Sequence, residues 1–144
     1  MKADEKTEAD VVKTLNKLMA AYRDRDIEKV MGFYAPDSDV TALGTNLDQF
    51  VMGTDGIREA YQDDFDAFDR LEMEVTGCQV SAEGSVAWLS AQCAAAFEIE
   101  GEKIRSNARL TAVLVRRQSA WRIIQFHLSF PADQQTTEVP SHRL

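Results

Sequence analysis

The order of its segments predicts an α+β domain for this chain, with three N-terminal helices packed on a curved, mainly antiparallel sheet. Residues 7–70 carry mostly helical periodicity, whereas residues 71–130 alternate apolar and polar side chains. Strands gathered after helices favour an α+β arrangement over alternating βα units. No linker or break in composition divides the chain, so we expect one domain over residues 7–131 and a polar, loosely ordered tail over residues 132–144.

The first predicted helix covers residues 7–22. Its apolar residues recur at steps of one, three and four, which places them on one helical face. They are Val11, Val12, Leu15, Leu18, Met19 and Tyr22. Thr7 and Asp10 form a capping-box pattern at the start of this helix. A short second helix follows, with Asp26 as its N-cap and Pro36 preventing its continuation.

A short strand over residues 39–43 and a third helix over residues 55–70 come next. The helical spacing assigns Ile57, Ala60, Tyr61, Phe65 and Phe68 to the inward face. The acidic residues of this helix, Asp63, Asp64, Asp66 and Asp69, are expected to face solvent.

Four consecutive antiparallel strands are predicted for the second half of the chain. The first includes residues 71–75, where apolar residues alternate with Glu and Thr. The three longer strands cover residues 86–99, 103–117 and 120–130. Turn-forming pairs separate the strands at Glu83-Gly84, Glu100-Gly101 and Gln118-Ser119.

Charge and missing motifs exclude several functions. The chain has 24 Asp and Glu against 16 Lys and Arg, a net charge of −8, which argues against nucleic-acid binding despite the basic segment 103–122. No apolar run reaches the ~18 residues of a membrane span, and the N-terminus lacks the apolar core of a signal peptide, which favours a cytoplasmic location. Without Cys-x-x-Cys, His-rich or Gly-rich phosphate motifs, we expect neither a metal nor a cofactor.

Several segments resemble the SnoaL-like branch of the nuclear transport factor 2-like superfamily. They are Asp26–Asp37, Gly56–Ala60, Arg109–Leu114 and Trp121–Ser129. The last two are also similar to the final hairpin of the association domain of calmodulin-dependent kinase II. The resemblance implies a cone-shaped fold with a mainly apolar pocket between helices and sheet. Because this superfamily holds isomerases, cyclases, transport factors and oligomerisation modules, the fold alone does not assign a function.

The steroid isomerase branch of the superfamily can be tested by position. The positions matching its catalytic tyrosine and aspartate base are Leu18 and Ala42, and the position of its protonated acid falls near Ala112 and Val113. None of these side chains can donate or accept a proton, so we expect no ketosteroid isomerisation. The resemblance therefore leaves an enzyme here without an identified base.

The predicted pocket combines aromatic and polar side chains from both layers. Its residues are Tyr22, Tyr61, Phe65, Trp88, Ser90, Gln92 and Phe126. Trp88, Ser90 and Gln92 are assigned the same sheet face as the apolar residues of segment 71–75, which would point them toward the helices. Trp88 can be core or pocket wall, and the buried amide predicted for Gln92 requires a partner from the protein or from a ligand.

The opposite face of the sheet is predicted to bury itself in a homodimer. Its apolar residues are Val113, Val115, Trp121 and Ile123, with His127 beside them. His127 can serve at this interface or in catalysis, and the sequence favours the interface.

Two functional hypotheses follow from these features. The first is a SnoaL-like protein that binds a small, largely apolar molecule and isomerises, cyclises or hydrates it without a cofactor. The second is a non-catalytic dimerisation or accessory module whose pocket is filled by its own side chains. A buried Asp, Glu or His that reaches into the pocket favours the first hypothesis, and its absence favours the second.

Overall fold

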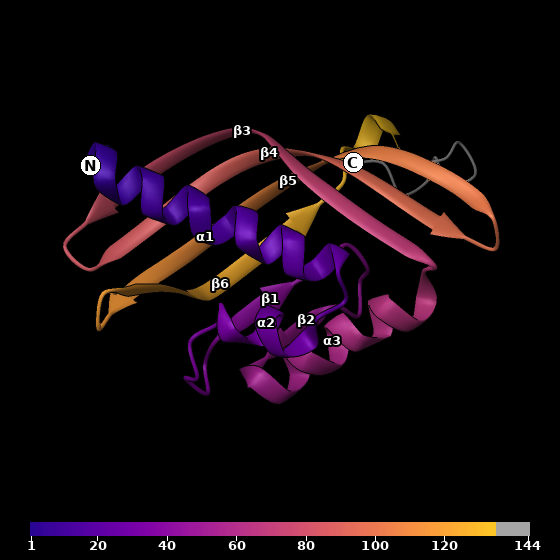
Figure 1. The fold of residues 1–144 in the computed structure, drawn as a ribbon, viewed down its shortest axis with the longest axis horizontal. Coiled ribbons are helices and arrows are strands. Elements are labelled where there is room, and N and C mark those ends of the chain that lie inside the picture. The colour runs from indigo at the N-terminus through magenta and orange to yellow at the C-terminus, as the bar shows by residue number, and fades with distance from the viewer. Residues whose placement is uncertain (135–144) are drawn as a thin grey trace.

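The computed structural model describes residues 1–134, and three helices and six strands make up their fold (Figure 1). In chain order these elements are α1 (Glu5–Arg23), α2 (Ile27–Gly32), β1 (Thr41–Leu43), β2 (Phe50–Met52), α3 (Gly53–Ala67), β3 (Arg70–Glu83), β4 (Val86–Ile99), β5 (Glu102–Arg117) and β6 (Ala120–Ser129). A short 3-10 helix over Ala132–Gln134 follows β6. The remainder of the predicted tail, residues 135–144, lies outside the described residues.

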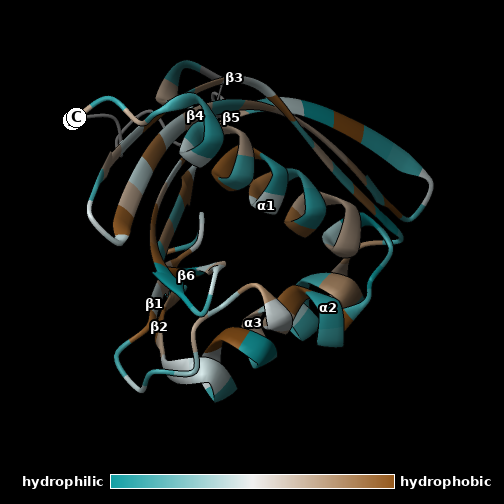
Figure 2. Ribbon diagram, turned by 60° about the vertical axis from the view of Figure 1, so that its left-hand side comes forward, coloured by the Kyte–Doolittle hydropathy of each residue, from teal (hydrophilic) through white to brown (hydrophobic). Residues whose placement is uncertain are grey.

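The six strands form one curved sheet in the order β2-β1-β6-β5-β4-β3, and the helices lie on its concave side (Figures 1 and 2). Only the β1–β6 pair among these strands is parallel. The predicted α+β class is confirmed. The sequence did not predict β2, because its three residues are too few to show a period of two.

The helix starts are set by aspartate caps. α1 begins two residues earlier than predicted because the Asp4 carboxylate, rather than Thr7, caps it by accepting a 2.7 Å hydrogen bond from the Thr7 backbone N–H. The predicted Asp26 cap of α2 is confirmed, since its carboxylate accepts from the Lys29 N–H at 3.1 Å. None of the helices within residues 1–134 is long and apolar enough to cross a membrane.

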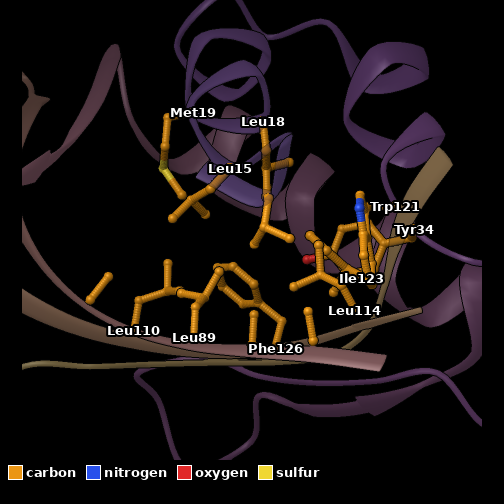
Figure 3. Packing of buried hydrophobic residues seen from close by; sticks show 14 of the residues in the cluster. Leu15, Leu18, Met19, Tyr34, Leu89, Leu110, Leu114, Trp121, Ile123 and Phe126 are labelled. Carbon is orange, nitrogen blue, oxygen red and sulfur yellow. The ribbon is translucent and has the colours of Figure 1, made fainter. Parts of the chain in front are cut away.

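The hydrophobic core lies between α1 and the concave face of the sheet (Figure 3). Side chains from both layers meet there: Leu15, Leu18 and Met19 from α1, and Leu89, Leu110 and Phe126 from the sheet. This packing confirms the inward face predicted for the first helix, since Leu15 and Leu18 are only 2% and 1% exposed. The core therefore fixes α1 across the strands that form the floor of the site.

A bulge in β3 reverses the predicted faces of β4. Between Val75 and Gly77 the register with β4 shifts by one residue. Met73 therefore pairs with the odd-numbered Ala95, whereas the sequence predicted the apolar residues of this segment on the same face as the even-numbered residues of β4. A one-residue shift moves every side chain beyond it to the other face. The even-numbered residues Trp88, Ser90 and Gln92 consequently lie on the outer face, and their predicted inward orientation is wrong. The odd-numbered residues, including the buried Leu89, face the helices instead.

A second bulge changes the predicted face of the first half of β6. Leu114 pairs with Ile123 whereas Val113 pairs with Gln125, which leaves Ile124 as the extra residue. Trp121 and Ile123, predicted on the outer face, are therefore buried inside at 7% and 1% exposure. Beyond the bulge the prediction is confirmed, because Phe126 is buried and His127 is exposed on the outer face.

Candidate functional site

An apolar cavity of about 600 Å³ lies between α1, α3, the β1–β2 hairpin and the sheet. This volume is within the range of ~300–1,000 Å³ that is typical of small-molecule sites. Its aromatic walls are formed by Tyr22, Tyr34, Tyr61, Phe68, Phe97, Phe126 and Phe130. Asp64 and Arg105 are the only charged residues among those that line it within the described chain. Figure 2 shows α1 and α3 facing one another across the concave side of the sheet.

Asp64 brings an ionisable carboxyl group to this apolar wall. It is half-buried, and its Oδ2 accepts a 3.2 Å hydrogen bond from the Tyr22 hydroxyl. Burial raises the pKa of this carboxyl above the ordinary aspartate value, and the bond from Tyr22 counteracts only part of this effect. Within residues 1–134, the other oxygen, Oδ1, accepts no hydrogen bond, so it is available to a ligand proton. A carboxylate with a raised pKa in an apolar cavity has the properties of a general base.

Tyr34 and Tyr61 form a hydroxyl pair in the same cavity. Their hydroxyl oxygens lie 2.7 Å apart, and either group can donate to the other. Burial raises the pKa of both phenols, so both keep their protons at neutral pH. Because the mutual bond uses only one of the two protons, the second is available to a ligand oxygen. The pair can therefore donate a hydrogen bond to a carbonyl or enolate in the cavity.

The aromatic rings connect these two polar groups. The Tyr22 and Tyr61 rings meet edge to face with their centroids 5.8 Å apart, and the Tyr61 and Tyr34 rings meet similarly at 6.0 Å. Phe65 packs behind them at 5.8 Å from Tyr22 and 6.4 Å from Tyr61. This packing restricts the rotamers of the tyrosines and so orients their hydroxyl groups.

Arg25 fixes the end of the helix that carries Asp64. Its guanidinium donates hydrogen bonds to the backbone carbonyls of Phe65 and Phe68, at the C-terminus of α3. These carbonyls have no partner within the helix, and the negative end of the helix dipole favours a cation there. The contact joins the α1–α2 turn to α3 within one turn of Asp64.

The structure brings together part of the predicted site. Tyr22, Tyr61 and Phe126 line the cavity, and Phe65 supports the two tyrosines from behind. The remaining three predicted residues, Trp88, Ser90 and Gln92, lie on the other side of the sheet, where they do not line this cavity.

Sequence reasoning missed Asp64, which was predicted to face solvent. The acidic residues of α3 were treated as one solvated group, although Asp63 is exposed and Asp64 is half-buried. A signal was present: Asp64 lies seven residues after the buried Ile57 and three after Tyr61, which places all three on one helical stripe. Tyr34, the partner of Tyr61, was considered as a hydroxyl donor but was not included in the predicted pocket.

No group of three or more His, Cys, Asp or Glu residues within positions 1–134 is arranged to hold a metal ion. Among the described residues, those that line the cavity supply one carboxylate, one arginine, several phenols, neutral polar groups and an apolar wall.

Together the cone of helices and sheet and the apolar cavity on its concave side define the class of nuclear transport factor 2-like domains. The profile of the SnoaL-like domain family matches residues 11–133, and the chain belongs to this family. A comparison with curated protein sequences gives no match.

Solved structures share this fold at low sequence identity. A nuclear transport factor 2-like superfamily protein from Salmonella enterica superposes with a TM-score of 0.82 at 15% identity, over 94% of this chain and 99% of that one. A candidate dehydratase of the same family from Streptomyces avermitilis gives 0.78 at 15%, over 85% and 95%. A candidate calcium/calmodulin-dependent protein kinase II association domain from Xanthomonas campestris gives 0.76 at 21%, over 85% and 86%.

Proposed function

We propose that this protein binds a flat, largely apolar molecule with a carbonyl group and catalyses its isomerisation, cyclisation or dehydration by acid–base chemistry. The observation that carries the proposal is the Asp64 carboxylate, half-buried in an apolar cavity with its pKa raised. Membership of the SnoaL-like family and a structural neighbour described as a candidate dehydratase support a function of this kind.

The cavity residues define a two-step proton transfer. Asp64 removes a proton from the carbon next to the carbonyl group, and the bonding electrons move into the ring system to give an enolate. The free proton of the Tyr34–Tyr61 pair stabilises the new oxygen charge by a hydrogen bond that strengthens as the charge develops. Protonated Asp64 then returns its proton to another atom of the substrate, or to a leaving hydroxyl group, which restores the carboxylate.

The experiment that tests this function is deuterium exchange into 2-tetralone, a bicyclic ketone with acidic α-protons. In D₂O, NMR should show exchange that rises in proportion to the protein concentration and saturates with ketone. 2-Naphthol, which resembles the enolate of this ketone, should inhibit competitively. Exchange no faster than in buffer with matched carboxylate would contradict catalysis and support the accessory module, the second hypothesis.

We also propose that a second copy of the chain covers the outer face of the sheet. Trp88 faces Val113 across β4 and β5, and the register continues this face to β2, where Phe50 and Met52 are 65% and 61% exposed. His127 is exposed near the middle of this face. Exposed apolar residues on one face of a sheet can be buried against the same face of a second copy, and this arrangement favours a dimer with two-fold symmetry.

Val113→Asp should disrupt this dimer, because pairing would bury an unpartnered carboxylate. Sedimentation velocity at micromolar concentration should show a dimer for the wild-type protein and a species near the 16.1 kDa monomer for the variant. Ser85→Asp, at an exposed turn, is the matched control and should remain dimeric. A monomeric wild-type protein would overturn the interface.

A further inference from the structure

The inner face of the β1–β2 hairpin carries a glutamine amide at the wall of the apolar cavity. Gly44 and Gln49 both line this cavity, and they close the hairpin through a 2.7 Å hydrogen bond from the Gly44 N–H to the Gln49 carbonyl. Because the next residue, Phe50, lies on the outer face of the sheet, Gln49 lies on the inner one. The Gln49 side chain is therefore on the side of the sheet that the helices cover.

Gly44 leaves the space in which the Gln49 amide lies. A Cβ atom at position 44 would be 2.5 Å from Gln49 Oε1 and 2.9 Å from its Cδ, much closer than two non-bonded atoms normally approach. The Asn46 N–H donates a 3.0 Å hydrogen bond to the same Oε1 and so holds this end of the amide against the hairpin backbone. Glycine at position 44 thus allows the amide to pack on the inner face in one fixed orientation.

The nitrogen end of this amide is not used by the protein. Within residues 1–134, Gln49 Nε2 forms no hydrogen bond, although the side chain is half-buried. An amide nitrogen carries two N–H donors, and a donor taken partly out of water is stabilised by an acceptor oxygen. Because the Asn46 N–H fixes Oε1, the group that Gln49 can offer to a ligand is the N–H donor.

The amide and the tyrosine hydroxyl pair lie at different heights along the cavity. The Tyr34 ring packs on Phe126 with a centroid distance of 6.4 Å, and Phe126 pairs with Ala42 of β1. Gly44, against which Gln49 packs, is two residues beyond Ala42, roughly 7 Å further along the strand. A ring system whose carbonyl meets the tyrosine pair can therefore place its other end beside Gln49.

We infer that the natural ligand carries a second acceptor oxygen, at the end of its ring system opposite the reacting carbonyl, and that Gln49 Nε2 donates a hydrogen bond to it. This inference rests on the proposed function, because it adds the substrate class, a ring system with oxygen at both ends, to the same cavity. A site that hydrogen-bonds a substrate oxygen discriminates against an analogue without it, since the buried donor is then unpaired. Gln49 is thus a specificity-determining residue.

Two naphthols of nearly the same shape test the inference. They are 6-acetyl-2-naphthol, which has a carbonyl oxygen on its second ring, and 6-isopropenyl-2-naphthol, in which a methylene group replaces that oxygen. Calorimetry on the wild-type protein should show that the acetyl compound binds about fivefold more tightly than the isopropenyl compound, as expected for one hydrogen bond between neutral groups.

Gln49→Glu keeps the oxygen that accepts from the Asn46 N–H but removes the amide donors, so the preference for the acetyl compound should be lost. Gly44→Ala keeps the glutamine but displaces its amide, and it should reduce the preference as well. Asp48→Asn, at an exposed position of the same loop that does not line the cavity, is the matched control and should keep the preference.

Equal binding of the two naphthols by the wild-type protein, or a preference that Gln49→Glu retains, would overturn the inference but not the proposed function. 2-Tetralone carries no second oxygen, so its α-proton exchange tests the proposed function separately. If 2-naphthol itself fails to bind, the proposed function and the inference are both wrong.

Discussion

Replacing Asp64 by asparagine is expected to slow the exchange of 2-tetralone α-protons by about 10²–10⁴-fold, the usual contribution of a positioned general base. Asparagine has nearly the same shape and still accepts the hydrogen bond from the Tyr22 hydroxyl, so the cavity wall is preserved while the base is lost. The affinity for 2-naphthol should change little, which separates chemistry from binding.

Asp63→Asn is the matched control, because Asp63 is the exposed neighbour on the same helix. It should keep full activity. The activity that depends on Asp64 should fall as the pH is lowered through its raised pKa, at a pH above the ordinary aspartate value of about 3.9. Equal exchange rates in the wild-type protein and Asp64→Asn would show that another group is the base.

Asp64→Asn should also stabilise the fold at neutral pH. Because burial raises the pKa of Asp64, the folded chain binds this proton more tightly than the unfolded chain, and stability falls as the pH rises between the unfolded and folded pKa values. Above both pKa values this loss of stability is complete. Below about pH 3 the Asp64 carboxyl is protonated in both the folded and the unfolded chain, so it no longer affects stability. Urea unfolding should therefore show a more stable Asp64→Asn at pH 7 and equal stabilities at low pH. A less stable variant at pH 7 would indicate a structural role for the charge.

Ile57→Ala should cost about 2–5 kcal/mol of unfolding free energy, the second large effect that the structure predicts. Among the described residues of α3, Ile57 is the only one that is fully buried, at 0% exposure. Its truncation leaves an empty volume between α3 and the core, which α3 can close only by moving the two site residues on the same stripe, Tyr61 and Asp64.

Urea unfolding of Ile57→Ala and of the exposed control Glu59→Ala measures this cost. The control should lie within about 0.5 kcal/mol of the wild-type protein. The catalysed exchange of Ile57→Ala should also fall at a temperature where the variant is still folded, because the base is held by α3. A cost similar to that of the control would show that α3 is held mainly by other contacts, such as the two carbonyl bonds from Arg25.

The sequence by itself determined the α+β class, the inward face of α1 and the bounds of β4. These features depend on local periodicity and on turn residues, both of which are present in the order of the amino acids whatever the tertiary structure is. Tyr61 and Phe126 line the cavity, as their local patterns predict. Tyr61 lies on the regular apolar stripe of α3, and Phe126 lies beyond the bulge of β6, where the alternation is regular.

Only the tertiary structure decided which face of the sheet the residues of β4 and the start of β6 occupy. The two bulges, at Val75–Gly77 and at Val113–Leu114, each shift a register by one residue. Gly77 lies at the first bulge and is a weak signal for it, whereas no glycine or proline lies at the second. The position of Asp64 is a similar case. Its helix contains several acids, and only the packing of α3 against α1 shows that this carboxyl lies beside Tyr22 in an apolar cavity while Asp63 stays in water. Burial is a property of the assembled layers, and the site exists because those layers leave one charged group inside.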